Sequence, residues 1–482
     1  MDPSEGKMAR AQNLDGAHEP GHGETVNPPR NRKGGTGNPS PTEDSSTTET
    51  TFTKLRRIAH TARQHPERAF TSLAHHIDID WLKEAFRRTR KDGTPGVDGQ
   101  TAAAYAENLE ENLSSLIDRL HTGRYRAPAV RRKHIPKAGS RAELRPIGIP
   151  TFEDKVLQRA VSMLLEAIYE RDFYNHSYGF RSQRSAHQAL HALWKQSMDL
   201  NGCWIIEVDI RKFFDTVDHG CLRNVIRRRV RDGVILRVLG KWLNAGVLED
   251  GAIHYPEEGT PQGGVISPLL ANIYLHAVID TWLERHVRPR LRGRMFWIRY
   301  ADDIVLGFEC EGDARRVLAA LPERFRQAGL TLHPQKTRLV DFCHPARRAR
   351  DHRRLVLPGT FTFLGFTHFW GCSRKGPQVV LRKTARDRLA RALGRVSQFC
   401  RAQRHTRVRE QHHSLQRKLI GHYNYFGITG NWDSLKKFRQ EVTRVWSYWL
   451  GRRSERRHMP WPRYQALLER YPLPKVRIYH TV

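Results

Sequence analysis

Two apolar runs that end in aspartates constrain the fold more than any other feature of the sequence. Residues 203–209 read CWIIEVD, an apolar strand that closes on Asp209. Residues 297–308 read WIRYADDIVLGF, two apolar strands around a turn that carries Asp302 and Asp303. Short runs rich in aromatic and β-branched residues are typical of buried strands. The pattern predicts an antiparallel sheet that brings three carboxylates together at one end.

Three converging carboxylates suit a particular chemistry. Mg²⁺ prefers oxygen ligands and is usually held by one or two carboxylates plus phosphates. In two-metal sites the ions lie about 3.5–4 Å apart, so carboxylates on neighbouring strands must converge. Asp209, Asp302 and Asp303 are therefore candidate ligands of a nucleotide-polymerising site. The competing interpretation is a solvated hairpin turn, which the apolar flanks and the partner acid on another strand disfavour.

The remainder of the chain mixes helical and strand-like patterns, so we predict the α+β class. Apolar spacing is mostly helical from Phe52 to about His121, with a glycine-rich loop at residues 93–99. Residues 125–150 read as short strands, and residues 361–370 alternate like a β-element. From about residue 381 onward we expect helices again. One helix follows residue 150 and presents an apolar face formed by Val156, Leu157, Ala160, Val161, Leu164, Leu165 and Ile168.

Charge indicates the class of partner. The chain has 482 residues, 82 Lys and Arg against 50 Asp and Glu, and a net charge of +32, which favours a polyanion such as nucleic acid. Residues 1–50 are net acidic and rich in small polar residues, so we expect a disordered tail. Residues 381–460 hold 20 Lys and Arg against five Asp and Glu. The strongest basic surface is therefore expected in the C-terminal part.

Two negative patterns narrow the interpretation further. The six cysteines show no CxxC spacing, which supports neither a zinc ribbon nor a redox motif. No apolar run is long enough to span a bilayer, and no signal-peptide pattern opens the chain. We therefore expect no membrane partner and a cytoplasmic location, in the bacterial cytosol or associated with the nucleoid.

Seven sequence blocks, in order, resemble those of reverse transcriptases. The run DIRKFFDTVDH at 209–219 and YADD at 300–303 resemble the two catalytic blocks. GTPQGGVISPLLANIYL at 259–275 resembles the block that lines the nucleotide and primer site. RPIGIP at 145–150 and SYGFRSQRSAH at 177–187 resemble the fingers blocks, and LHPQKT at 332–337 and FLGF at 363–366 the last two. The resemblance implies RNA-directed DNA polymerase activity and a right-hand fold, with fingers and an antiparallel palm sheet.

Matching positions imply roles for individual residues. Asp209, Asp302 and Asp303 would be catalytic and would hold two Mg²⁺ ions, with Mn²⁺ as a substitute, assisted by the Ile210 carbonyl. Phe214 would favour dNTPs by crowding a ribose 2′-hydroxyl, unless it is only a core residue beside Phe213. The other implied nucleotide contacts are Lys137, Lys155, Arg145, Gln262 and Lys336. Lys155 departs from the family, where Arg is common.

The C-terminal part resembles the thumb, or maturase (X) domain, of bacterial group II intron-encoded proteins, in the runs GHYNYFGI at 421–428 and WLGRRS at 449–454. The loop GTPGVDGQT at 93–101 shares this resemblance and is either a template clamp or a connector. An apolar stripe consists of Leu435, Phe438, Val442, Val445 and Trp449. The expected RNA and primer-template contacts are Arg131, Arg132, Arg181, Lys436, Lys437, Arg439, Arg444, Arg452 and Arg453.

The resemblance also implies domains and partners. We expect a tail at 1–50, fingers and palm at 51–370 with an N-terminal extension to about 124, an all-α basic thumb at 371–454, and a short extension at 455–482. The implied partners are group II intron RNA, an RNA template with a DNA primer, dNTPs and target DNA. No cysteine-paired endonuclease region is evident, which resembles endonuclease-lacking, class C-like lineages.

Two alternatives remain open. One is a related reverse transcriptase that serves phage defence or diversity generation without an intron. The other is an RNA-binding splicing maturase whose polymerase site is idle, which the three intact aspartates disfavour.

Overall fold

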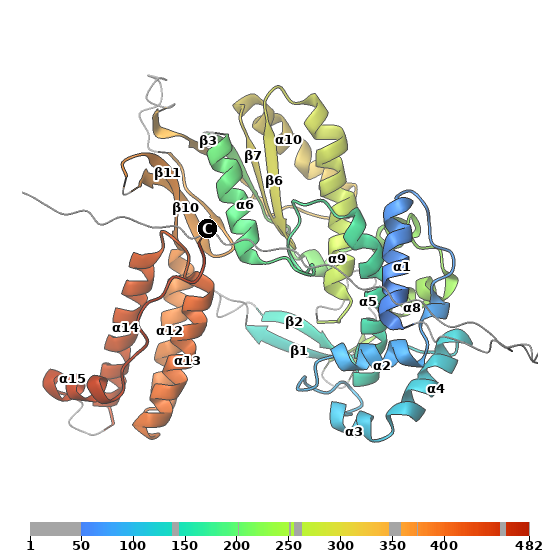
Figure 1. Ribbon diagram of the computed structural model, residues 1–482, viewed down its shortest axis with the longest axis horizontal. Helices are drawn as coiled ribbons and strands as arrows, with labels where there is room; N and C mark the ends of the chain where they lie inside the picture. Colours follow the sequence, from blue (N-terminus) through green and yellow to red (C-terminus); the bar gives the residue numbers. More distant parts are fainter. Residues whose placement is uncertain are drawn as a thin grey trace, which may run out of the picture. The chain divides into compact units, whose positions relative to one another are not determined.

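The chain folds as an α+β protein, which confirms the predicted class (Figure 1). The computed structural model describes residues 50–136, 144–200, 202–249, 252–254, 263–346, 358–373, 375–453 and 459–481. The predicted disordered tail up to residue 49, and the predicted contacts Lys137 and Gln262, lie outside these residues. Within the described residues, no helix combines the length and apolarity that crossing a membrane requires.

The predicted carboxylate-bearing sheet is present. It has four strands in the order β6 (Met295–Tyr300), β7 (Asp303–Phe308), β3 (Gly202–Val208) and β8 (Arg338–Cys343). All neighbouring strands pair antiparallel. The register sets Val208 opposite Ile304 and Tyr300 opposite Asp303. The end of β3 therefore lies beside the turn that joins β6 to β7.

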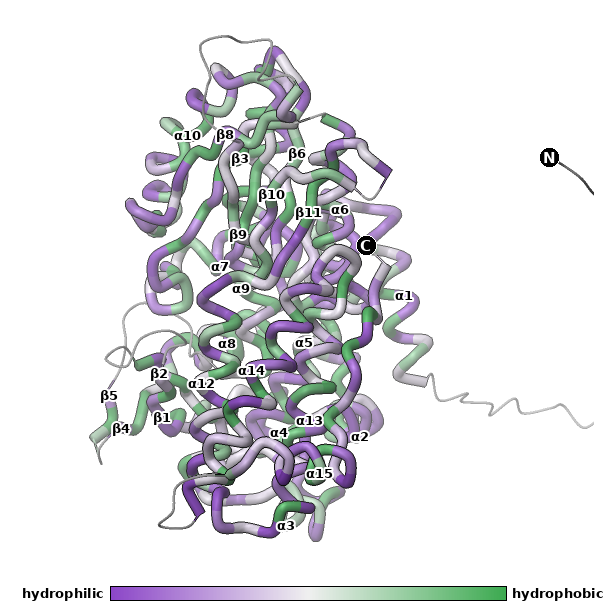
Figure 2. The backbone as a smooth tube through the Cα atoms, turned by 90° about the vertical axis from the view of Figure 1, so that its left-hand side faces the viewer, coloured by the Kyte–Doolittle hydropathy of each residue, from purple (hydrophilic) through white to green (hydrophobic). Residues whose placement is uncertain are grey.

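Helices cover both faces of this sheet, α6 (Ala186–Asp199) on one side and α10 (Glu311–Arg326) on the other (Figure 2). Alternate residues of β3 separate accordingly. Cys203 and Ile205 belong to the apolar cluster that includes residues of α6, and Trp204 and Ile206 to the cluster that includes residues of α10. Because both faces are buried, the strands are apolar at nearly every position, which explains the unalternating runs in the sequence.

A helical region surrounds α5 (Phe152–Asp172), whose seven predicted apolar positions are all buried. Arg229 joins α5 to the chain that follows α1, because it pairs with Asp172 and donates to the carbonyls of Ala62, His65 and Arg68. The helices of this region are α1 (Thr51–Gln64), η1 (Ala74–His76), α2 (Ile79–Arg88), α3 (Ala102–Glu107), α4 (Leu109–His121), η2 (Phe213–Asp215), α7 (His219–Arg227), α8 (Gly233–Leu243) and α9 (Ser267–Leu275).

Two further features complete this part of the chain. A second sheet has the strand order β2 (Leu144–Ile149), β1 (Val130–Pro136), β4 (Val247–Glu249) and β5 (Ala252–His254), and contains the short strands expected at 125–150. Helix α9 continues through two π-turns, η3 (His276–Asp280) and η4 (Leu283–Val287), and ends in η5 (Arg288–Arg290). Such π-turns often occur at functional sites.

The expectation of helix from about residue 381 was wrong by five residues. Residues 378–384 form strand β11 (Gln378–Thr384), which pairs along its whole length with β10 (Phe366–Cys372), itself paired with β9 (Phe361–Phe363). The seven residues QVVLRKT bury alternate side chains against the neighbouring core, and their β-branched Val and Thr residues favour a strand. Helix begins at Arg386.

The C-terminal helices form a bundle of α12 (Arg386–Ala402), α13 (Val408–Phe426), α14 (Trp432–Gly451) and α15 (Trp461–Arg470) with its own apolar core. The predicted stripe on α14 is correct for Leu435, Phe438 and Val442. Farther along, Trp446 and Leu450 are fully buried, whereas Val445 and Trp449 are only partly buried. The stripe follows the 3.6-residue period of a straight helix, so it drifts away from a strict 3–4 repeat.

Residues after 458 pack onto this bundle rather than beyond it. Tyr464 of α15 is completely buried in the bundle core and donates through its hydroxyl to the Thr443 carbonyl at 2.8 Å. Near the other end of α13, the backbone N–H of Tyr479 donates to the Gly427 carbonyl at 2.8 Å. The predicted boundary at residue 454 therefore does not mark the end of bundle packing.

His368 of β10 makes stability depend on pH. Its ring is fully buried and stacks on Phe361 at 4.7 Å, and neither ring nitrogen has a hydrogen-bond partner among the described residues. Burial, followed by the charge of Arg382, lowers the pKa of His368 to about 3. Between pH 6.5 and that value the unfolded chain binds a proton that the folded protein does not. Folding is therefore destabilised as the pH falls through this window.

We expect His368→Phe to remove this dependence while keeping the ring stack. The variant should gain stability over the wild type by about 1.4 kcal/mol for each pH unit between about pH 6 and pH 4. Denaturant unfolding at several pH values measures this difference. Unfolding free energies that run parallel with pH in the two proteins would contradict the assignment.

Candidate active site

The three predicted aspartates meet at one end of the central sheet. Asp209 follows the last residue of β3, Asp302 lies in the turn after β6, and Asp303 begins β7. Since Val208 pairs with Ile304, the next position along β3 lies beside Asp303. The sheet register therefore brings together the acids that the sequence pattern placed on separate strands.

The turn that carries Asp302 is a strained two-residue connection. Tyr300 pairs with Asp303, so only Ala301 and Asp302 link the strands. Ala301 has a φ of +57°, the left-handed region that glycine adopts without penalty. An alanine in this conformation costs about 1 kcal/mol or more. Surrounding contacts must hold the turn in place.

Burial and neighbouring negative charge raise the pKa values of two of the carboxylates, Asp302 and Asp303. Desolvation by the surrounding protein, followed by the charges of Asp302 and Asp209, raises the pKa of Asp303 to about 6. Desolvation also raises the pKa of Asp302, which the Asp209 charge raises further and the Arg145 charge lowers. Lys336 Nζ lies 3.2 Å from Asp209 Oδ2 and offsets part of the negative charge. A bound cation would relieve this repulsion.

The segment after β3 is held by the chain that precedes β8. The backbone N–H of His333 donates to the Asp209 carbonyl at 2.8 Å, and Thr337 Oγ1 accepts from the Asp209 N–H at 3.3 Å. Ile210 forms an antiparallel bridge with Leu332 in which the flanking residues make the hydrogen bonds. The Ile210 carbonyl therefore points away from Leu332 and is free to face a ligand.

The donor set fits a hard divalent cation. Asp209, Asp302, Asp303 and the Ile210 carbonyl offer only oxygen atoms, the ligands that Mg²⁺ prefers. Among the described residues, no three His, Cys, Asp or Glu side chains converge closely enough to enclose an ion. Magnesium usually takes only one or two carboxylates and completes its shell with phosphates and water. An open site between Asp209 and Asp302 meets that requirement.

Cations of the β1–β2 hairpin lie within electrostatic reach of the site. Arg145 lowers the pKa of Asp302, and both Arg145 and Arg132 lower that of Asp215 against the larger effect of its burial. Arg132 also lies 3.7 Å from Glu249. The register pairs Arg145 with Ile135, so Arg145 lies on the same face of the hairpin as Arg131, and Arg132 lies on the other face.

Lys155 holds the glycine-rich loop. Its Nζ donates to the Thr94 carbonyl at 2.8 Å, and burial lowers its pKa. A Cβ on Gly96 would lie 2.5 Å from the Thr151 Cα, so this loop packs directly on the start of α5. The loop at 93–99 is thus anchored to α5, and Lys155 would have to release Thr94 to reach a phosphate.

Two other positions of the predicted nucleotide site are described. Phe214 lies edge-on to Phe213 with a centroid distance of 5.3 Å and is only partly buried, which leaves part of its ring accessible. Gly263, next to Gln262, has a φ of +118°, and a Cβ there would lie 2.6 Å from the Gly148 carbonyl oxygen. Glycine is required at 263 because its backbone contacts strand β2.

The predicted RNA-binding cations are not all available to RNA. The expectation for Arg181 was wrong: its guanidinium is buried and binds Glu170 together with the carbonyls of Tyr174 and Ser177. In the bundle, Arg439 donates to the Leu473 and Pro474 carbonyls, Arg453 to those of Arg404 and Thr406, and Arg444 pairs with Glu441. Lys436 and Lys437 are exposed on α14, and Arg452 lies over the Tyr448 ring at 4.4 Å.

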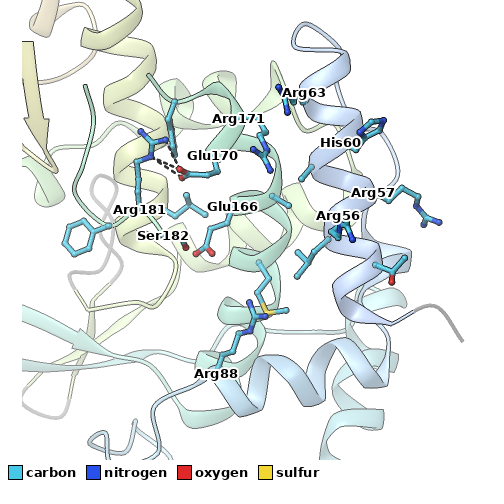
Figure 3. Close-up of a pocket in the computed structure, with 18 residues that line it drawn as sticks. Arg56, Arg57, His60, Arg63, Arg88, Glu166, Glu170, Arg171, Arg181 and Ser182 are labelled. Carbon is cyan, nitrogen blue, oxygen red and sulfur yellow. Dashed lines mark hydrogen bonds and ion pairs between the residues drawn. The ribbon is translucent and has the colours of Figure 1, made fainter. Parts of the chain in front are cut away.

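A cavity of about 690 Å³ lies apart from the carboxylates, between α1 and α5 (Figure 3). Its floor is apolar, with Met163, Ala167 and Leu269 among its residues. Its rim carries the cations Arg56, Arg57, His60, Arg63, Arg88, Arg171 and Arg181 and the two carboxylates Glu166 and Glu170. Sequence reasoning missed this site because its cations come from distant segments.

Sequence reasoning also missed Thr337 and Arg299, which contact the backbone on either side of the carboxylates. Arg299 carried a signal, since it is the one charged residue in the strand that precedes the turn.

Comparison with known proteins agrees with this geometry. Residues 135–368 match the reverse transcriptase (RNA-dependent DNA polymerase) family. The chain is 41% identical to protein YkfC of Escherichia coli over 225 residues, which is 45% of this chain and 58% of that protein. It is 38% identical to the group II intron-encoded protein LtrA of Lactococcus lactis over 230 residues, 47% of this chain and 37% of that protein.

A third relative is nuclear intron maturase 2, mitochondrial, of Arabidopsis thaliana, 26% identical over 231 residues, which cover 40% of this chain and 30% of that protein. The chain thus spans less than two thirds of the length of each of these relatives. The resemblance inferred from the sequence blocks is confirmed. Residues 135–368 match reverse transcriptases, and over part of its length the chain is similar to a group II intron-encoded protein and to an intron maturase.

Proposed function

We propose that this chain is an RNA-directed DNA polymerase encoded by a group II intron, and that it also acts as a maturase in splicing and intron mobility. The observation that carries the proposal is the convergence of Asp209, Asp302 and Asp303 at one end of a sheet whose domain matches reverse transcriptases. In this proposal the palm comprises the central sheet, the fingers the β1–β2 hairpin, and the thumb the helices α12–α15.

The carboxylates are proposed to hold two Mg²⁺ ions, for which Mn²⁺ can substitute, with the Ile210 carbonyl as an added ligand. When bound, such ions activate the primer 3′-hydroxyl for attack on the dNTP α-phosphate and neutralise the pyrophosphate leaving group. Lys336 orients Asp209 through their 3.2 Å ion pair. The strained turn at Ala301 presents Asp302 and Asp303 at the end of the central sheet.

The fingers are proposed to bind the incoming dNTP. Arg145 lies close enough to influence Asp302, so a triphosphate at the metals would lie between them. The accessible part of Phe214 would face the ribose and crowd a 2′-hydroxyl. Lys155, Lys137 and Gln262 complete the proposed nucleotide contacts, with Lys155 released from Thr94 on binding.

The RNA partners are proposed to contact two basic regions. One is the outer surface of α14 and its C-terminal end, with Lys436, Lys437 and Arg452, where template, primer and target DNA would pass. The other is the cavity between α1 and α5, where Arg56, His60 and Arg63 follow one another along a single face of α1 (Figure 3). Arg171 approaches from α5, and an apolar floor beneath them suits an unstacked base. We assign this cavity to intron RNA.

A single-atom change separates the polymerase from a splicing-only maturase. Asp302→Asn removes a metal-binding charge without changing side-chain size, so primer extension on an RNA template should fall by about 10²–10³-fold or more. Binding and splicing of the intron RNA should persist. Gel-based primer extension and splicing assays on the same preparation measure both activities.

The matched control is Asp118→Asn, which removes an exposed carboxylate from α4. Full primer extension by the Asp302→Asn protein would sink the assigned site. Wild-type protein that splices but never extends a primer would identify the idle-site alternative.

Replacing Arg56, Arg63 and Arg171 with glutamine should weaken intron RNA binding by removing phosphate contacts. Affinity depends on salt through counterion release, with a slope of about 0.7 per phosphate contact for single-stranded RNA. The slope of log affinity against log salt should therefore decrease by about 1–2 in the triple variant. Filter binding across a salt series measures it.

Three exposed arginines on α10, Arg315, Arg316 and Arg326, provide a charge-matched control because all are paired with carboxylates on their own helix. An equal loss of affinity in the two triple variants would show that only net charge matters and would remove the cavity from the RNA interface.

A further inference from the structure

Arg299 is completely buried in β6, one residue before the Tyr300–Asp303 hairpin end, and its ion-pair partner Asp280 is buried equally. Arg299 Nε donates to both Asp280 carboxylate oxygens at 3.0 and 3.1 Å, and Nη2 donates to Oδ2 at 2.6 Å. Asp280 lies at the end of the π-turn η3. A two-pronged contact of this kind fixes the direction of the guanidinium as well as its position.

The remaining edge of the Arg299 guanidinium reaches the turn itself. Nη1 donates to the Ala301 carbonyl at 3.3 Å and to Asn272 Oδ1 at 2.8 Å. Asn272, fully buried on α9, donates in turn to the Gly179 carbonyl at 2.6 Å. One side chain therefore connects the strained alanine to α9, to η3 and to the loop at residues 177–179.

The loop at residues 177–179 also contacts the backbone at residues 299–301 directly. Ser177 pairs with Arg299 in a parallel bridge, and the N–H of Tyr178 donates to the Arg299 carbonyl at 2.8 Å. A Cβ on Gly179 would lie only 2.3 Å from the Ala301 nitrogen. The Ala301 peptide is thus enclosed between Gly179 and the hydrogen bond from Arg299.

Stability alone does not account for this arrangement. A buried ion pair loses in desolvation much of what it gains in attraction, and well-packed apolar residues often replace such a pair at no cost. A non-glycine residue at φ +57°, in contrast, persists only where its surroundings enforce it. The two observations concern residues two positions apart that share a hydrogen bond, and each explains the other.

We propose that Arg299, oriented by Asp280 and Asn272, is a positioning residue that holds the Ala301–Asp302 turn in the conformation in which its carboxylates bind metal. Arg299 itself touches no reacting atom. The inference rests on the proposed polymerase site, and it adds a set of residues outside that site on which metal affinity depends.

Two variants test the proposal. Arg299→Lys keeps the charge but loses the fork that spans Asp280, Asn272 and Ala301. The pair Arg299→Met with Asp280→Leu removes both buried charges together, so it leaves no unpaired ion and should fold even where the lysine variant does not. Electron paramagnetic resonance measures the Mn²⁺ affinity of the full chain in complex with primer-template. This readout does not depend on turnover. The Mg²⁺ midpoint of primer extension, the primer-template affinity and the melting temperature are measured beside it.

The matched control is Arg229→Lys. Arg229 is also a buried arginine that pairs with a carboxylate and donates to backbone carbonyls, but none of its partners belongs to the turn. Its loss should lower the melting temperature and leave the metal midpoint unchanged.

We expect metal binding to weaken by about tenfold in both Arg299 variants, as is usual when the support of metal ligands is removed. Primer-template affinity should stay within about twofold. A folded neutral-pair variant with the wild-type metal midpoint overturns the proposal, and so does an equal shift in Arg229→Lys. If Mn²⁺ binds the wild type and the Asp302→Asn variant equally, the proposed polymerase site has failed instead.

Discussion

Burial of the central sheet on both faces is the constraint on which this molecule depends. With α6 on one side and α10 on the other, the middle positions of β3, β6 and β7 are buried and offer no place for a charge in water. Charged groups must then lie at the strand ends or be paired within the core. The aspartates Asp209, Asp302 and Asp303 lie at strand ends. Arg299 is paired with Asp280 within the core. The same burial that makes the strands apolar thus collects the acids at one end.

This constraint determines how well the sequence could be interpreted. Continuous apolar runs that stop at acids predicted both the sheet and its functional end, because two-sided burial leaves little freedom in register. The apolar face of α5 was predicted residue by residue for the same reason. Strand β11 was missed because its seven residues are specified by pairing with β10, which local spacing does not record.

Side-chain partners were the part that the sequence could not provide. Arg181 looks like any fingers cation until Glu170 and two carbonyls are seen around it. The arginines that line the cavity between α1 and α5 come from segments more than a hundred residues apart. No local sequence pattern predicts that such residues lie close together. Spacing along the chain indicates which residues share a face, whereas the role of a cation is decided by what faces it.

The arginines of the C-terminal bundle show how misleading a sum of charges can be. Arg439 donates hydrogen bonds to carbonyls of the segment after α15, and Arg453 donates to carbonyls between α12 and α13. Both arginines therefore cross-link parts of the bundle. An alanine scan across this basic region would therefore combine two different defects, weaker binding at the exposed lysines that we propose to contact RNA and a loosened bundle at the partly buried guanidinium groups of Arg439 and Arg453. Only a scan that reports folding beside binding can assign each cation to its proper role.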